Sequence, residues 1–193
     1  MKTICIFLAE GFEEMEAMFP LDVMRRGGLN VKTVSVTGEK TVVSSHQVPI
    51  VADMLFEDLK EEDVEMVVLP GGLPGATNLD AHAGLDKLIM SFAAAGKPLA
   101  AICAAPMVYG KRGLLKGKKA TCYPGFTNIW KVQNIQAIWL KLSITLSWVK
   151  VRVLLRLLLL LFWKNMQEQK KLWKLKKECC LPDEEIYHCR SRR

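Results

Sequence analysis

The chain has 193 residues, 50% of them hydrophobic, and carries a formal net charge of +7 at pH 7. A chain of this length and apolar content can bury a sizeable core, which excludes a disordered, highly charged tail protein. Taken over the whole chain, the positive charge would suggest nucleic acid or a membrane surface as a partner. That interpretation depends on where the charge lies.

The two ends of the chain differ in composition. Residues 1–126 hold 13 Lys and Arg against 15 Asp and Glu, a charge of −2, whereas residues 127–193 hold 14 against 5, a charge of +9. All 13 glycines lie before position 126, and all five tryptophans lie after it. We therefore treat residues 1–126 as one natural unit and residues 127–193 as an aberrant basic tail. Because the excess charge lies only in that tail, we expect neither nucleic acid nor a membrane as a partner.

The tail is apolar but has no stretch long enough to span a membrane. Its uncharged apolar runs, among them residues 142–149 and 157–163, fall short of the roughly 18 to 20 residues that a spanning helix needs. The six cysteines form no CxxC pair and no disulfide-framework spacing, and no signal peptide precedes the first strand-like run. We expect a reduced, cytoplasmic protein.

Strand-like and helix-like patterns alternate over residues 1–126. Residues 3–9 form an apolar run, and the following stretch to Arg26 has a helical period with acidic residues at its start and glycine after it. Further elements are predicted in this order: a strand at 31–36, a hairpin or edge segment at 42–51, a strand at 65–69, a helix at 80–95 and a strand at 98–102. This order indicates a parallel sheet covered by helices on both faces, with its chemistry at the carboxyl ends of the strands.

Cys103 directly follows the last of these strands. Pro106 suits the first turn of a helix, so the cysteine is expected on a sharp strand-to-helix turn that resembles a nucleophile elbow. Free backbone amides and the helix dipole there would favour a thiolate. The alternative is a small buried hydrophobic side chain, the common fate of a free cysteine, and position alone does not decide between the two. We expect Cys5 and Cys122 to be core residues.

Two other loops follow strands. Gly71 and Gly72 would let backbone N–H groups point into a site, although a plain tight turn explains them equally well and the spacing fits neither GxGxxG nor a P-loop. Three acidic residues in the loop after the first strand suit the first turn of a helix: Glu13, Glu14 and Glu16. The three histidines show no metal-ligand spacing, so we expect no metal site: His46, His82 and His188.

Three blocks in order resemble the DJ-1/PfpI superfamily, in its DJ-1 (ThiJ-like) branch. They are AEGFEEMEAMFPLDVMRRGG (9–28), VVLPGGLPGATNL (67–79) and LAAICAAPMVYG (99–110). The resemblance implies a flavodoxin-like three-layer α/β sandwich with a mostly parallel sheet, usually in a homodimer. By the same motifs Cys103 matches the family's nucleophile and Glu16 the acid that hydrogen-bonds it. Gly72 and Ala104 match the residues whose amides form an oxyanion-type pocket, next to Gly71.

The resemblance implies action on reactive aldehydes without a cofactor. Glyoxalase III and deglycase activities are attributed to this branch, together with a role in oxidative stress. A Cys103 thiolate would attack an aldehyde such as methylglyoxal to give a hemithioacetal, with a protonated Glu16 of raised pKa beside it. Several relatives carry histidine where this chain has Tyr123, a possible pocket residue that is a poor general base near neutral pH. Peptidase activity is therefore disfavoured.

The resemblance implies that residues 1–126 are the N-terminal two-thirds of a DJ-1/PfpI domain. After Phe126 the resemblance stops, and the genetic code suggests a reason. We rebuilt a shifted reading frame by joining the third base of each residue's codon to the first two bases of the next residue's codon. The shifted frame permits LEGAEYTG from 129–137, GKGPGAA from 148–155 and an LEKYAG-like end from 162–168. These resemble the family's late segments, in order and in one frame. We hypothesise a frameshift at or just after Phe126, in the gene or in its sequencing. The competing interpretations are a basic amphipathic helix and a true accessory domain.

The function stays open between two classes. One is a cysteine-dependent glyoxalase or deglycase. The other is a non-enzymatic redox sensor or chaperone-like protein whose Cys103 is oxidised. Older naming would add a thiazole monophosphate biosynthesis protein, for which the residues give no physical support. If the frameshift exists in the cell, we expect a poorly soluble and inactive chain.

Overall fold

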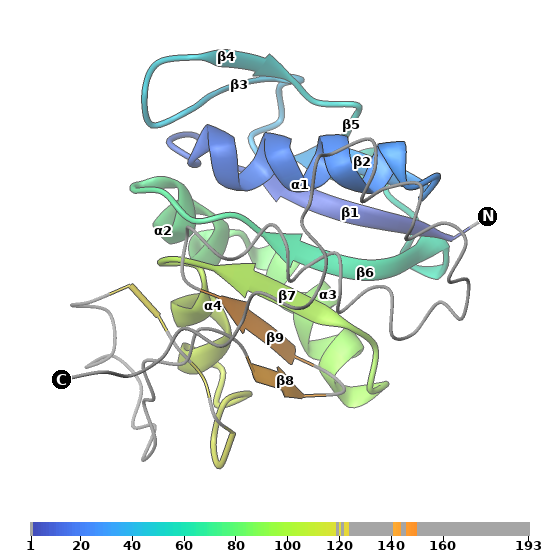
Figure 1. Cartoon of the computed structure of the whole chain (residues 1–193), viewed down its shortest axis with the longest axis vertical. Helices are drawn as coiled ribbons and strands as arrows, with labels where there is room; N and C mark the ends of the chain where they lie inside the picture. The colour runs from blue at the N-terminus through green and yellow to red at the C-terminus, as the bar shows by residue number, and fades with distance from the viewer. Residues whose placement is uncertain (1, 119, 121, 124–140, 144–145, 150–193) are drawn as a thin grey trace, which may run out of the picture.

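The structure is a computed structural model that describes residues 2–118, 120, 122–123, 141–143 and 146–149 (Figure 1). Its main sheet has the strand order β5-β2-β1-β6-β7-β9-β8, and all neighbours are parallel except β8 and β9. The strands, in chain order, are β1 Thr3–Leu8, β2 Val31–Ser35, β5 Met54–Leu55, β6 Val64–Leu69, β7 Leu99–Ile102, β8 Lys141–Ser143 and β9 Leu146–Val149. The predicted, mostly parallel sheet is confirmed.

The alternation of side chains along β1 builds two cores. Ile4, Ile6 and Leu8 join one buried cluster, whereas Cys5 and Phe7 join the other. Helix α1 (Glu14–Arg26) and the hairpin of β3 (Thr41–Val43) and β4 (Pro49–Val51) lie over the first cluster. Helices α2 (Gly75–Ala81), α3 (Ala83–Ala94) and α4 (Pro106–Lys111) lie over the second (Figure 1). The result is the predicted three-layer α/β sandwich.

The predicted helix over residues 80–95 is wrong at its start. The chain makes two helices there, and His82 separates them with extended backbone (φ −79°, ψ 107°). Its Nδ1 accepts a hydrogen bond from the Leu85 amide at 2.9 Å and so caps α3. The His82 and Phe56 rings also pack in a T-shaped arrangement, with ring centroids 4.6 Å apart. A side chain that caps the next helix, rather than a Gly or Pro, causes the break.

The remaining elements are short. Two 3-10 helices, η1 (Phe56–Asp58) and η2 (Glu61–Asp63), connect β5 to β6, and the two-residue β5 was not predicted. The sheet continues beyond β7 with β9, whose Leu146 pairs with Leu99 and whose Val149 pairs with Ile102. The C-terminal part of the fold was expected to be missing or altered, and these two strands are its described portion. Apart from them, the tail after Phe126 lies outside the described residues.

Within the described part of the chain, no helix combines the length and the apolar character needed to cross a membrane.

Candidate active site

Cys103 lies on the turn that links β7 to α4. Its φ of +56° is in the left-handed region, where a residue with a side chain is strained by about 1 kcal/mol or more. The Ala105 amide donates to the Ile102 carbonyl at 2.9 Å, which closes the turn around the cysteine. Pro106 then begins α4. The strained residue is therefore the one that the sequence places on an elbow.

Glu16 points from the first turn of α1 toward this cysteine. Its side chain is buried, and the residue is 3% exposed. Oε2 accepts a hydrogen bond from the Gly71 amide at 2.8 Å, and a further hydrogen bond joins the carboxyl to the Cys103 thiol. Burial raises the pKa of Glu16 to about 7, with a smaller contribution from the charge of Glu13, against the lowering effect of the Gly71 amide. The carboxyl is thus poised to gain or lose a proton near neutral pH.

Glu16 and Cys103 both lie against Gly71. A Cβ built on Gly71 would lie 2.6 Å from Glu16 Oε2 and 2.7 Å from Cys103 Cβ. No larger residue fits between acid and thiol. Gly72, at φ +88°, would bring a Cβ within 2.4 Å of the Glu13 amide nitrogen. Both glycines are therefore required by close backbone approach.

The pKa of Cys103 runs against the sequence expectation of a favoured thiolate. Burial raises the pKa of the thiol to about 12, and the charge of Glu16 and its hydrogen bond with the thiol add to this effect. The amides of Ala104 and Gly72 hydrogen-bond the sulfur and lower its pKa. At rest the thiol proton therefore lies on the Cys103 sulfur, while Glu16, with a pKa of about 7, is about half ionised at neutral pH. Transfer of the thiol proton to an ionised Glu16 avoids two adjacent negative charges and leaves a thiolate facing two amides.

The structure brings Cys103, Glu16, Gly71, Gly72 and Ala104 together. Tyr123 also reaches the site, but through its backbone. The Tyr123 amide donates to the Cys103 carbonyl at 2.7 Å, and the residue is 53% exposed. Within the described part of the chain the Tyr123 phenol makes no hydrogen bond to the other residues of the site, so the role of Tyr123 as a pocket residue stays a prediction.

Glu13 and Glu14 have structural roles at the start of α1. Glu13 caps the helix by accepting from the Glu16 amide at 2.7 Å, and Glu14 pairs with His46 at 2.8 Å. The ligand atoms of these three residues lie within 4.8 Å of one another. Sequence spacing did not reveal this group, because His46 comes from the hairpin. The ion pair between Glu14 and His46 already accounts for their proximity.

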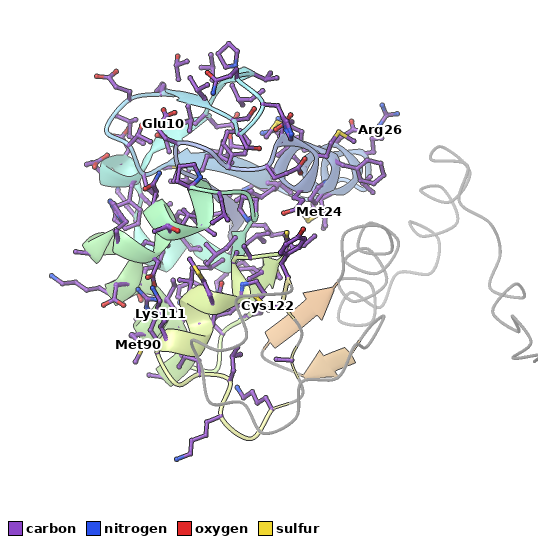
Figure 2. All side chains as sticks on the ribbon, turned by 90° about the vertical axis from the view of Figure 1, so that its left-hand side faces the viewer. Glu10, Met24, Arg26, Met90, Lys111 and Cys122 are labelled. Carbon is purple, nitrogen blue, oxygen red and sulfur yellow. The ribbon has the colours of Figure 1, made fainter. Side chains whose placement is uncertain are left out.

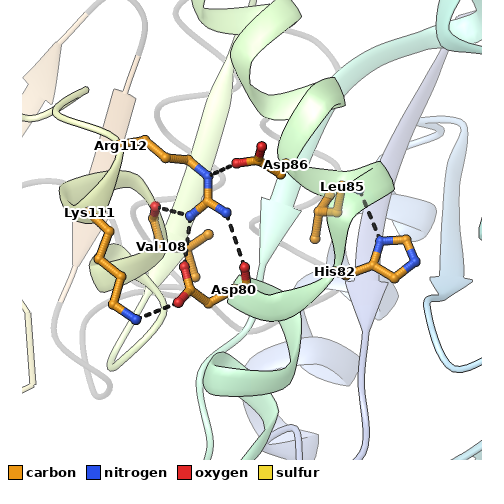
Figure 3. Close-up of polar contacts among 7 residues, drawn as sticks. All are labelled: Asp80, His82, Leu85, Asp86, Val108, Lys111 and Arg112. Atoms are coloured by element: carbon orange, nitrogen blue, oxygen red, sulfur yellow. Dashed lines mark hydrogen bonds and ion pairs between the residues drawn. The ribbon is translucent and has the colours of Figure 1, made fainter.

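Sequence reasoning missed an ion-pair cluster that joins the end of α4 to α2 and α3 (Figure 3). Arg112, at the end of α4, pairs with Asp80 at 2.8 Å and with Asp86, and also donates to the Val108 carbonyl. Lys111 pairs with Asp80 as well. The cluster ties the helix that follows Cys103 to α2 and α3. No residue spacing along the chain signals it, since the partners are 26 to 32 residues apart.

A strained cysteine on a strand-to-helix turn, beside a buried carboxyl and two amides, defines a class of flavodoxin-like proteins with a candidate nucleophilic thiol. The DJ-1/PfpI family model matches residues 2–144, which is more than half of the chain. The chain belongs to the DJ-1/PfpI family.

Curated relatives include Protein DJ-1 homolog B of Arabidopsis thaliana, 42% identical over 126 residues, which is 65% of this chain and 29% of that protein. Protein dj-1beta of Drosophila melanogaster is 37% identical over 123 residues, covering 64% of this chain and 66% of the relative. A protein named Deglycase PH1704, of Pyrococcus horikoshii, is 26% identical over 151 residues, covering 78% and 89%. The chain thus spans about a third of the Arabidopsis relative and just under two thirds of the Drosophila one.

Solved structures agree on the fold. A mutant of a DJ-1 superfamily protein from Salmonella typhimurium superposes with a TM-score of 0.85 at 28% identity, covering 95% of this chain and all of that one. Oxidized DJ-1 of Toxoplasma gondii gives a TM-score of 0.84 at 27% identity, covering 93% and 98%.

Proposed function

We propose that the chain is a DJ-1-like, cysteine-dependent protein acting on reactive aldehydes, in the manner of a glyoxalase or deglycase. The observation that carries the proposal is the strained Cys103 turn, where the sulfur meets Glu16 and the amides of Ala104 and Gly72. The name of the Pyrococcus relative, a deglycase, supports the same substrate class. No step requires a cofactor.

The first step joins the sulfur to the carbonyl carbon of an aldehyde such as methylglyoxal. The Cys103 proton moves to Glu16, the S–C bond forms, and the carbonyl π electrons move to oxygen. The resulting hemithioacetal oxyanion lies where the Gly72 and Ala104 amides donate hydrogen bonds. These donors are fixed by the backbone, so they need no rearrangement during the reaction.

Glu16 then carries the proton transfers that follow. Its raised pKa of about 7 lets it hold a proton in one step and accept one in the next at neutral pH. For methylglyoxal, transfer of the hydrogen from the aldehyde carbon to the neighbouring carbonyl carbon gives a thioester, and water releases lactate from it. The overall change is the addition of one water molecule, without any redox partner.

The direct test measures lactate formation from methylglyoxal by the chain with its C-terminal reading frame restored, as proposed below for residues 127–193, and by the Cys103→Ser variant of that restored chain. Ser keeps the volume but lacks an ionisable thiol, so turnover should fall to background, a loss of at least about 10³-fold. Cys5→Ser is the matched control, because Cys5 is a buried thiol on β1 away from the turn. Equal turnover in all three proteins would sink the proposal.

A redox sensor or chaperone-like protein is the second candidate, because the Cys103 thiol is only partly buried and an oxidant can reach it. In that case peroxide would convert Cys103 to sulfinate while methylglyoxal stays unconsumed. The two outcomes are measured on the same sample by intact mass and by lactate release.

We also propose that two copies associate through α1 and the β3–β4 hairpin. Met15 is 62% exposed at the start of α1, and Val51 and Val48 on the hairpin are 70% and 42% exposed. The hairpin lies against the start of α1 through Ser45, whose amide donates to the Phe12 carbonyl at 2.8 Å. Apolar side chains at adjacent elements suit a self-association surface. Val51→Lys should turn a dimer into a monomer in sedimentation experiments.

For residues 127–193 we propose translation in the wrong frame. Supporting this, the plant and insect relatives match over 123 to 126 residues only, and the tail has no glycine in 67 residues. Independent sequencing of the gene tests it. An uninterrupted frame encoding this tail would refute the proposal. A restored frame should yield soluble protein with lactate-forming activity, whereas the chain with this tail should be poorly soluble and inactive.

A further inference from the structure

Cys122 lies against the backbone carbonyls of the turn that holds Cys103. Its Sγ donates to the Cys103 carbonyl at 3.2 Å and to the Ala104 carbonyl at 3.7 Å. The next residue, Tyr123, donates its amide to the same Cys103 carbonyl at 2.7 Å. Cys122 is 7% exposed and belongs to the buried cluster under α2, α3 and α4 (Figure 2). The Cys103 carbonyl therefore receives two hydrogen bonds from one short segment of the chain.

The Cys103 carbonyl and the Ala104 amide belong to one peptide group. This group is planar and trans, so its C=O and its N–H point in opposite directions. On the N–H side, the Ala104 amide hydrogen-bonds the Cys103 sulfur. Holding the carbonyl toward Cys122 and Tyr123 therefore aims the amide at the sulfur, where the oxyanion of the proposed reaction would form.

A second orientation of this peptide is compatible with the turn. The Ala105 amide donates to the Ile102 carbonyl at 2.9 Å, so residues 102–105 form a β-turn with the Cys103–Ala104 peptide at its centre. Of these two central residues only Cys103 has a positive φ, which is the pattern of a type II′ turn. A type I′ turn differs by rotation of the central peptide, which would aim the carbonyl where the amide now points. Type II′ turns favour glycine at the position that Cys103 occupies, so contacts elsewhere must help to hold this orientation.

We propose that Cys122 is a positioning residue for Cys103: its thiol, together with the Tyr123 amide, holds the Cys103–Ala104 peptide so that the Ala104 amide faces the reacting sulfur and oxyanion. The inference deepens the proposed function, on which it rests, and gives a role to a thiol that the aldehyde mechanism leaves unused. Burial raises the pKa of Cys122 to about 11, so this thiol keeps its proton and stays a donor at neutral pH.

The first test compares Cys122→Ala with Cys122→Ser in the chain with its C-terminal reading frame restored. Ser keeps a hydroxyl donor, whereas Ala leaves the Cys103 carbonyl with the Tyr123 amide alone. Loss of a whole oxyanion donor lowers kcat by on the order of 10² to 10³-fold, so loss of one of the two contacts that aim it should lower kcat for methylglyoxal by about tenfold. KM should stay within about twofold, because the amide acts on the oxyanion, and Cys122→Ser should restore kcat.

The second readout is the rate at which iodoacetamide alkylates Cys103 at pH 8, which requires no turnover. The Ala104 amide lowers the pKa of the Cys103 thiol, so turning it away should leave less thiolate and slow alkylation by about tenfold in Cys122→Ala. Looser packing would act in the opposite direction, because burial is the largest cause of the raised pKa. Mass spectrometry of the tryptic peptide 88–111, which holds Cys103, follows the reaction.

Cys122→Val distinguishes loss of the donor from the cavity that Ala leaves. Val fills the site without a donor, so it should slow alkylation as Ala does, whereas Cys5→Ser, the buried-thiol control, should react like the parent chain. Alkylation at the parent rate or faster in both Cys122→Ala and Cys122→Val would overturn the inference, and lactate formation by those variants at the parent rate would leave the proposed function standing. A parent chain that forms no lactate would refute the proposed function, and the alkylation rates would still decide whether Cys122 positions the peptide.

Discussion

Glu16 and Asp80 are two carboxylates with limited solvent contact and opposite surroundings. Asp80, whose side chain is 15% exposed, pairs with both Lys111 and Arg112 and so meets two cations (Figure 3). Glu16, buried more deeply, accepts from the Gly71 amide and the Cys103 thiol, and among the described residues it meets no cation. Burial consequently raises the pKa of Glu16 to about 7, whereas Asp80 shares in an ion-pair cluster.

The difference distinguishes Asp80, whose ion pairs stabilise the fold, from Glu16, for which we propose a role in proton transfer. A paired carboxylate is compensated for its lost hydration, and it ties helices together. An uncompensated carboxylate weakens the fold at neutral pH and is retained only where its proton is useful. This comparison yields four experiments, in order of decreasing expected effect.

Glu16→Gln tests the proposed role of Glu16 in taking up the Cys103 proton. The amide keeps the shape but cannot take up the Cys103 proton, so kcat/KM for methylglyoxal should fall by about 10² to 10³-fold. Asp22→Asn on the same helix is the matched control, because Asp22 is an exposed partner of Arg26. Retention of activity within about twofold in Glu16→Gln would show that the proton goes elsewhere.

The same substitution should stabilise the protein above neutral pH. Folding raises the pKa of Glu16 from 4.5 to about 7, so the native state binds more protons than the unfolded state between these values. The free energy of unfolding should therefore fall by up to about 3 kcal/mol as pH rises from about 4.5 to about 7. Urea unfolding at pH 4.5 and pH 8 measures this. Glu16→Gln should lack that loss, and parallel pH profiles for the two proteins would contradict the assignment.

Arg112→Met tests how much the ion pairs of Asp80 stabilise the fold. It removes the cation shared by Asp80 and Asp86 and leaves Asp80 with Lys111 alone, so we expect a loss of about 2 to 3 kcal/mol in the free energy of unfolding. Lys111→Met is the control, because that side chain is 39% exposed and its pairing should contribute less than about 1 kcal/mol. Equal effects of the two variants would remove the distinction between a buried and a surface partner.

The smallest effect is expected at His82. Its neutral ring caps α3, and burial lowers its pKa, so this stabilisation is complete above the ordinary value of 6.5 and is lost as pH falls through the lower folded-state pKa. His82→Ala should cost about 1 kcal/mol at pH 8 and less at low pH. His82→Asn, which can still cap, should recover most of that loss. A cost that does not change with pH would assign the effect to packing on Phe56 instead.

Most of the fold was predictable because its signals are local. The apolar runs that became β1, β6 and β7 and the capped period of α1 follow from neighbouring residues alone. The break at His82 was not predictable, since it depends on a side chain folding back on Leu85 and on the contact with Phe56. A two-residue strand such as β5 likewise carries too few residues to show a period.

The raised pKa of Glu16 and the residues that surround Cys103 were predictable, but the protonated state of the Cys103 thiol was not. Position after a strand and the family blocks placed Cys103, Glu16 and the glycines together. The raised pKa of Cys103 depends on burial and on the Glu16 charge, which come from packing between distant segments. For the same reason the Arg112 cluster and the contact of Cys122 with the turn were visible only in the structure.

Because Gly71 has no side chain, residues from distant parts of the chain meet at its backbone, and this bears on when the site forms during folding. The glycine bridges residues from three parts of the chain, and its bond to Glu16 spans 55 residues. We expect a contact between residues this far apart in the sequence to form only after β1, β6 and β7 have paired, because closing the long loop between them costs conformational entropy. We therefore predict that the proposed reactivity of Cys103 arises late in folding, and that a nascent or partly folded chain presents an ordinary thiol.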